Sequence, residues 1–112
     1  MKYVLVTGAS TGIGYSAVEH LINSGYGVFG SVRKQEDSTR LESVFGENFT
    51  PLIFDVTDED AILESVKVVE SKLTSTDQLV AIVNNSGIAL GGPIQHLPTD
   101  IYRKQFEVNL FG

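Results

Sequence analysis

Residues 7–14 read Thr7-Gly8-Ala9-Ser10-Thr11-Gly12-Ile13-Gly14, and these spaced glycines are the clearest indication of the fold. Residues 3–6, just before it, form an apolar and β-branched run that predicts a buried strand. After it, apolar residues recur at helical spacing as far as Gly25, which predicts an amphipathic helix that ends there. The glycines therefore join a buried strand to a helix.

Such a junction has the physical properties of a phosphate-binding loop. Glycine lets the chain turn sharply off the strand and brings bare backbone close to a ligand. The helix that follows directs unpaired N–H groups and the positive end of its dipole at an anion. The stretch thus predicts a site for a phosphate-bearing ligand.

Composition narrows the class of protein. The chain has 112 residues, 42% hydrophobic and 20% charged, which predicts one domain over residues 1–112. A net charge of −6 without any basic cluster argues against nucleic acid or an anionic membrane as partner. With no cysteine and two distant histidines, no metal site can be argued. We find no signal-peptide core or membrane-length apolar run, so we expect a soluble cytoplasmic protein.

Strands and helices alternate along the rest of the chain. Further strands are expected at residues 26–32, 49–54 and 79–83, all buried, with Pro51 favouring an edge position for the middle one. Helices are expected around residues 41–45, from a capping box at Thr57, and from an N-cap at Thr99. This βαβαβαβα order predicts an α/β fold whose parallel sheet is covered on both faces.

Ligands of such sheets lie outside the carboxyl ends of the strands. The second strand ends at Arg33, whose guanidinium can fork two hydrogen bonds to the 2′-phosphate of NADP, whereas an acid there would favour NAD. We therefore favour NADP over NAD. The alternative is that Arg33 and Lys34 are solvated loop charges.

The third and fourth strands end in groups that suit a nucleotide. Asp55, followed by Val56, could accept a hydrogen bond from an adenine amino group, or it could simply be a first-turn helix acid. The run Asn84-Asn85-Ser86-Gly87 offers amides that can tie neighbouring strands together and line a ligand.

Taken together, Thr7-Gly8-x-x-x-Gly12-x-Gly14, Asp55, Asn84-Asn85-Ser86-Gly87 and Asn109 resemble the short-chain dehydrogenase/reductase family. The resemblance covers the whole chain but less than half of a usual member. It implies a Rossmann-type doubly wound parallel sheet with strand order 3-2-1-4, truncated within the helix after the fourth strand. It also implies an oxidoreductase that transfers hydride between a nicotinamide cofactor and an alcohol or carbonyl substrate.

The resemblance assigns roles to individual residues. Asn109 matches the helix asparagine that helps to hold a water in the family's proton relay. The residues it places at the cofactor, with Arg33 added from the reasoning above, are Gly8, Ser10, Thr11, Gly12, Ile13, Gly14, Asp55, Val56, Asn84, Asn85 and Gly87. Two departures are small: Ser86 stands where alanine is usual, and Thr11 where NADP-preferring members often have a basic residue.

A third departure is large. The family's catalysis uses a serine and a Tyr-x-x-x-Lys pair downstream of the asparagine, and no tyrosine here is followed by lysine four residues later. Without a positioned acid or base, the rate of hydride transfer falls by about 10²–10⁴-fold through the loss of acid–base catalysis alone. We therefore expect residues 1–112, which stop inside the last helix at Gly112, to be inactive by themselves.

Three kinds of function stay open on this basis. The chain could be the cofactor-binding part of an NADP-dependent oxidoreductase, a non-catalytic dinucleotide-binding module, or a self-associating fragment. The first is favoured because Asn109 would have little purpose in a sensor. We also expect self-association as a homo-oligomer, because the outer edge of the fourth strand has no neighbour.

Overall fold

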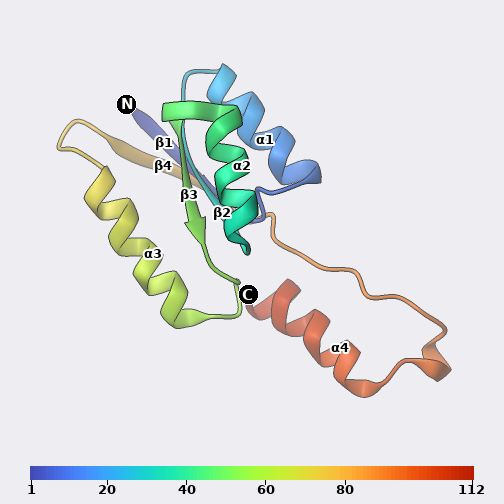
Figure 1. The fold of residues 1–112 in the computed structure, drawn as a ribbon. Helices are drawn as coiled ribbons and strands as arrows, with labels where there is room; N and C mark the ends of the chain where they lie inside the picture. Colours follow the sequence, from blue (N-terminus) through green and yellow to red (C-terminus); the bar gives the residue numbers. More distant parts are fainter.

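Four parallel strands run through the centre of the computed structural model, which describes all of residues 1–112 (Figure 1). They are β1 (Lys2–Val6), β2 (Gly27–Val32), β3 (Phe49–Ile53) and β4 (Gln78–Val83). Their order in the sheet is β3-β2-β1-β4, with every neighbouring pair parallel. The predicted α/β class and the strand order 3-2-1-4 are therefore confirmed, and Pro51 lies in an edge strand as expected.

The connecting helices cover the two faces of the sheet. They are α1 (Gly12–Asn23), α2 (Gln35–Phe45), α3 (Glu59–Lys72) and α4 (Thr99–Phe106), with short turns η1 (Gly46–Asn48) and η2 (Ile94–His96), and a π-helical turn η3 (Glu107–Phe111). Helices α1 and α2 lie on one side of the sheet, and α3 lies on the other (Figure 1). Because the four strands are parallel, their carboxyl ends and the loops that follow them lie at the same edge of the sheet.

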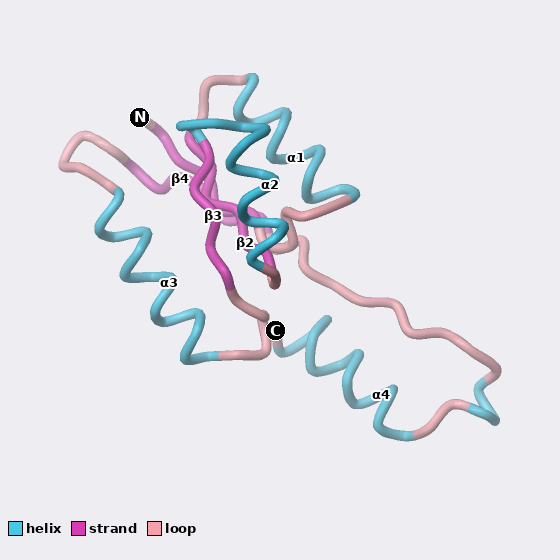
Figure 2. Tube along the Cα trace, in the orientation of Figure 1, coloured by secondary structure: helices cyan, strands magenta, loops and turns pink.

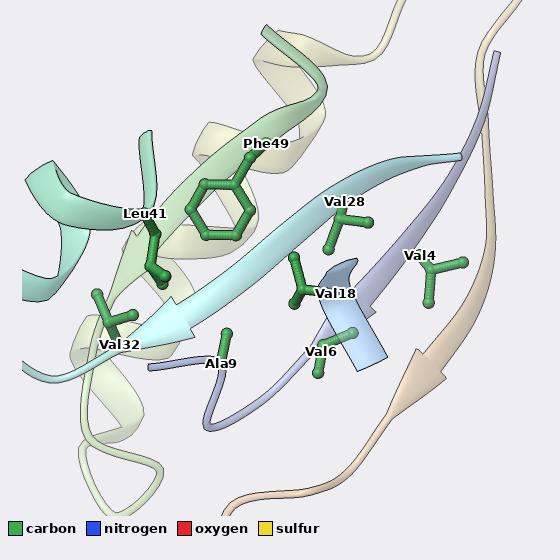
Figure 3. Packing of buried hydrophobic residues seen from close by; sticks show 8 residues of the cluster. All are labelled: Val4, Val6, Ala9, Val18, Val28, Val32, Leu41 and Phe49. Atoms are coloured by element: carbon green, nitrogen blue, oxygen red, sulfur yellow. The ribbon is translucent and has the colours of Figure 1, made fainter. Parts of the chain in front are cut away.

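The core is built on β2, which is buried along its whole length. On one face, Val28 and Val32 belong to a cluster that also contains Val18 of α1 and Leu41 of α2 (Figure 3). On the other face, Phe29 belongs to a second cluster with residues of β3 and α3. This alternation is the two-residue period of a strand with helices on both sides, and it holds the strand ends in fixed register.

The start of α3 differs from the expected capping box. Asp58, not Thr57, is the N-cap, and its carboxylate accepts a hydrogen bond from the Ala61 amide at 3.0 Å. The Thr57 hydroxyl donates instead to Asp55 at 2.7 Å. An ionised carboxylate is the stronger acceptor, and it also interacts favourably with the helix dipole, so aspartate takes the cap.

The prediction that the fourth strand is buried is wrong for this chain. Every residue of β4 is exposed, and Ile82 is 58% exposed. The reason is that β4 pairs with β1 alone, and α4 does not pack over it. The helices thus cover both faces of the sheet at β2, whereas β4 presents its apolar side chains to solvent.

The chain leaves the sheet after β4 and returns on a separate helix. Figure 2 shows a long loop running out from β4 and α4 running back, so that the C-terminus lies near the end of β3. Gly112 lies against Val56 there, because a Cβ on Gly112 would come within 2.6 Å of a Val56 methyl group. The helix itself begins at Thr99, with Pro98 at the cap position in place of the expected threonine. None of the helices combines the length and apolarity that crossing a bilayer requires.

The N-terminus is tied to the loop that precedes β4. The Met1 ammonium donates to Asp77 at 2.8 Å, and the Met1 carbonyl accepts from the Gln78 amide at 3.1 Å. The same carboxylate accepts from the amide and the hydroxyl of Thr74 at 2.9 and 2.7 Å. Led by the hydrogen bond from the N-terminus, these contacts lower the pKa of Asp77 from 3.8 to about 2.

This lowered pKa predicts a pH dependence of stability. Because Asp77 binds its proton less readily in the folded state, its contribution is present above about pH 4 and is lost as the pH falls toward 2. We expect Asp77→Asn to lower the thermal midpoint at about pH 5 and to approach wild type near pH 2. Circular dichroism melts across this range measure the difference, and a gap that stays constant with pH would contradict the assignment.

Candidate functional site

A cleft lies at the carboxyl ends of the four strands, where each strand passes into its loop. Most of the site residues predicted from the sequence line this cleft, and each of the four strand ends contributes some of them. These residues are Gly8, Ser10 and Thr11 after β1, Arg33 after β2, Asp55 and Val56 after β3, and Asn85 and Gly87 after β4. The fold therefore brings together segments separated by up to about 80 residues of sequence. No three His, Asp or Glu side chains are placed so that they could hold a metal ion together.

The glycine loop is held from beneath by β2. The Gly8 amide donates to the hydroxyl of Ser31 at 3.0 Å, and the Ala9 amide donates to the Ser31 carbonyl at 2.8 Å. The amide of Gly8 is thus already used within the protein, and what glycine supplies at this position is the left-handed backbone, with φ at 66°. Ser31 was missed by sequence reasoning because it lies inside an apolar strand.

The N-terminus of α1 is free to receive an anion. Thr11 is the N-cap, its side chain makes no capping hydrogen bond, and the first turn contains no acid. The amides of Gly12, Ile13 and Gly14 have no acceptor within the helix, whose first bond runs from Tyr15 to Thr11. These three residues form the turn beside the cleft without lining it, and Ile13 is 82% exposed.

The glycine loop and the end of β4 are joined by a network of hydrogen bonds. The Thr7 hydroxyl accepts from the amides of Asn85 and Ser86 at 2.9 and 3.0 Å. The Asn85 side chain donates in return to the carbonyls of Thr7 and Gly8, both at 3.1 Å. Thr7 was not nominated as a site residue, although its place before the first glycine is the signal that could have found it.

The two asparagines of the Asn84-Asn85 pair have different positions. Asn85 makes the contacts between strands that the sequence led us to expect from this run. Asn84 is exposed and lies outside the cleft lining. Successive residues of extended chain point to opposite sides, so only one of the two amides can reach the glycine loop.

Arg33 and Asp55 face the same end of the cleft with opposite charges. The Asp55 carboxylate accepts from the Thr57 amide at 2.9 Å and from its hydroxyl. These bonds, with smaller effects from Arg33 and Lys104, lower the pKa of Asp55, so the carboxylate stays ionised. The alternative that Asp55 is a first-turn helix acid is wrong, because α3 begins at Glu59.

A second arginine holds the glycine loop from the side of α2. Arg40 donates to the Ser10 carbonyl at 2.6 Å and to the Asp37 carboxylate at 3.1 Å. The guanidinium thus ties α2 to the loop, although no spacing in the sequence points to it. Arg33, by contrast, is exposed and makes no ion pair within the chain.

Asn109 lies behind the wall of the cleft. Its side-chain oxygen accepts from the Ile88 amide at 2.8 Å, and its nitrogen donates to the Ile88 carbonyl at 2.8 Å. Ile88 lines the cleft, whereas Asn109 does not. In residues 1–112 the asparagine amide is therefore engaged with backbone next to the cleft.

Comparison with known proteins agrees with this geometry. The family described as short chain dehydrogenase matches residues 2–112. The NADPH-dependent 3-dehydrocapnine reductase of Ornithobacterium rhinotracheale is 43% identical over 112 residues, all of this chain and 39% of that protein. A probable NADP-dependent dehydrogenase of Haemophilus influenzae is 39% identical over 87 residues, 78% of this chain and 33% of that protein.

Solved structures show the same fold. The 3-ketoacyl-(acyl-carrier-protein) reductase of Brucella melitensis, complexed with NADH, superposes with a TM-score of 0.87 at 22% identity, covering 97% of this chain and 44% of that one. Residues 1–112 thus span less than half the length of each of these three proteins. The match over residues 2–112, the sheet order and the glycine cleft agree: the chain belongs to the short-chain dehydrogenase family, of which it represents the N-terminal part.

Proposed function

We propose that residues 1–112 are the NADP-binding part of an oxidoreductase that transfers hydride between a nicotinamide cofactor and an alcohol or carbonyl substrate. The observation that carries this proposal is Arg33, an exposed guanidinium without an ion-pair partner, which lines a cleft that the free N-terminus of α1 borders. The guanidinium can bind the 2′-phosphate of NADP, and the free amides at the start of α1 can bind its pyrophosphate.

The cleft residues fit a phosphorylated dinucleotide. The free amides at the start of α1 suit the pyrophosphate, and the hydroxyls of Ser10 and Thr11 suit the phosphorylated ribose. Asp55 is ionised and keeps one carboxylate oxygen free for an adenine amino group, with Val56 against the ring. The names of two relatives, which mention NADPH and NADP, support the same preference.

The opposite half of the cleft suits the nicotinamide ribose. There, Gly87 lets backbone approach a ligand, and Asn85 holds the end of β4 on the glycine loop. Bound nicotinamide would supply the hydride chemistry, which no side chain of this stretch can provide. Asn109, through its hold on the backbone of Ile88, would take part in the proton relay of the whole protein.

The preference for NADP is tested by Arg33→Ala. Loss of a charge-assisted hydrogen bond to phosphate costs about 1.5–3 kcal/mol, so we expect the affinity for NADP to fall by about 100-fold. The affinity for NAD, which has no 2′-phosphate, should stay within about twofold of wild type. Calorimetric titration of both cofactors into wild type and variant measures the two ratios.

Lys34→Ala is the matched control. Lys34 is the adjacent cation on the same exposed loop, but it lies outside the cleft lining. Its removal should leave NADP affinity nearly unchanged, apart from a small salt-dependent effect of net charge. Tighter binding of NAD than of NADP would contradict the cofactor preference, and binding of neither would contradict the proposed function.

A further inference from the structure

A second guanidinium lies against the glycine loop, on the side of α2. Helices α1 and α2 lie on the same side of the sheet (Figure 1), and both begin at the edge where the strands end. Arg40, in the second turn of α2, donates through Nη2 to the carbonyl of Ser10 at 2.6 Å. Because Ser10 lines the cleft, the guanidinium of Arg40 lies directly outside the part that we propose for the phosphorylated ribose.

The guanidinium of Arg40 is only partly used within the protein. Its two hydrogen bonds, to the Ser10 carbonyl and to the Asp37 carboxylate at 3.1 Å, both come from Nη2. The N–H groups of Nε and Nη1 have no acceptor, and 44% of the side chain is exposed. An arginine in this state still has donors to offer to an anion that binds beside Ser10.

Asp37 keeps Arg40 in place and is itself a negative charge close to the cleft. The ion pair joins two partly exposed side chains one turn apart on α2, and pairs of this kind are weak. A phosphate monoester carries up to two negative charges and accepts paired hydrogen bonds from a guanidinium, so it competes well with Asp37. Removal of Arg40 would leave the Asp37 carboxylate unpaired, and that carboxylate would then repel a phosphate.

The three cations at this end of the cleft differ in what they contact. Arg33 lines the cleft, and Arg40 is bonded to the glycine loop. Lys34 does neither, since it lies outside the lining and makes no side-chain hydrogen bond or ion pair. Of the two cations outside the lining, therefore, only Arg40 is held beside the phosphorylated ribose.

We infer that Arg40 is a second specificity-determining residue for NADP, which binds the 2′-phosphate together with Arg33. Ser10 and Asp37 hold its guanidinium beside the cleft before the cofactor arrives, and the free N–H groups of Nε and Nη1 receive the phosphate. The inference rests on the proposed function, since it concerns the same cofactor.

The test uses Arg40→Met, which keeps most of the aliphatic side chain and removes the charge and the donors. We expect the affinity for NADP to fall by about tenfold, because the 2′-phosphate loses a charge-assisted hydrogen bond and Asp37 loses its partner. This is less than for Arg33→Ala, because Arg40 gives up its bond to Asp37 when it binds phosphate. The affinity for NAD should stay within about twofold of wild type, as calorimetric titration of both cofactors measures.

Asp37→Asn should have the opposite effect. It removes a negative charge near the 2′-phosphate and the acceptor that competes for Arg40, so we expect NADP to bind about threefold more tightly and NAD to bind as before. If the Asp37–Arg40 pair only stabilised the loop, both variants would weaken both cofactors. An Asp37→Asn protein that binds NADP no more tightly than wild type would overturn the inference.

Lys67→Met is the matched control for net charge. Lys67 is also an exposed cation that pairs with an acid three residues earlier, Glu64 at 2.6 Å, but it belongs to α3 and lies outside the cleft lining. It should change neither affinity. The inference is overturned if wild type prefers NADP and Arg40→Met keeps that preference, or if Arg40→Met weakens NADP and NAD alike. Failure of wild type to bind either cofactor would instead overturn the proposed function, and the role of Arg40 with it.

Discussion

Replacing Gly14 by alanine is expected to destabilise the protein by about 2–3 kcal/mol, although the same change in most helices is stabilising. A Cβ at Gly14 would overlap the Gly8 carbonyl oxygen and come within 2.5 Å of the Asn85 side-chain nitrogen. Because the first of these atoms is backbone, α1 must move away from the glycine loop. Overpacking of this kind costs about 1–3 kcal/mol or more, which outweighs a gain in helix propensity of at most about 1 kcal/mol.

Thermal unfolding followed by circular dichroism measures this loss, which corresponds to a fall in midpoint of roughly 10 °C or more. Gly12→Ala is the matched control, since nothing lies within 4 Å of a Cβ at that position. Its cost comes only from the left-handed backbone, with φ at 60°, and amounts to about 1 kcal/mol. A Gly14→Ala protein as stable as wild type, or less affected than Gly12→Ala, would show that α1 does not pack on the loop in this way.

Thr7→Val is expected to destabilise the protein by about 3 kcal/mol while preserving the shape of the side chain. The valine has no oxygen to accept from the amides of Asn85 and Ser86, so two partly buried donors lose their partner. Each such donor costs about 1–3 kcal/mol. The effect should be visible as a lower urea midpoint and as faster hydrogen exchange at both amides.

Thr7→Ser distinguishes the contribution of the Thr7 hydroxyl to stability from that of its methyl group. Serine keeps the acceptor and loses only a methyl group at a position that is 8% exposed, which costs about 1 kcal/mol. The hydrogen-bond network between the glycine loop and β4 should therefore be kept in this variant, with slow hydrogen exchange at the amides of Asn85 and Ser86. Equal losses in Thr7→Val and Thr7→Ser would assign the stability of this region to packing and not to the two hydrogen bonds.

Local patterns in the sequence predicted most of the secondary structure. The apolar run before Gly8 and the helical stripe after Gly14 predicted β1 and α1, and Pro51 indicated an edge strand because proline removes a donor from the ladder. The two helix caps that were predicted wrongly are also local details. Thr57 bonds to Asp55 and the stronger acceptor Asp58 caps α3, while Pro98 takes the cap position expected for Thr99.

The burial of the fourth strand could not be predicted from its residues. The sequence of β4 is apolar throughout, as for a strand covered on both faces, yet each of its residues is exposed in residues 1–112. Burial belongs to the neighbours of a strand and not to the strand itself. Here the neighbours are β1 on one edge and nothing on the other.

The candidate site likewise has features that could be predicted from the sequence and features that could not. The sequence indicated that a glycine-spaced turn joins a strand to a helix, and that Arg33, Asp55 and Asn85 follow other strands, because these features depend on neighbouring residues. The bonds from Thr7 to Asn85, 78 residues away, and from the Gly8 amide to Ser31 became known only from the folded structure. The physical reason is that a hydrogen bond between distant residues depends on the register of the sheet, which is set by the packing of the whole core and by no single stretch of chain.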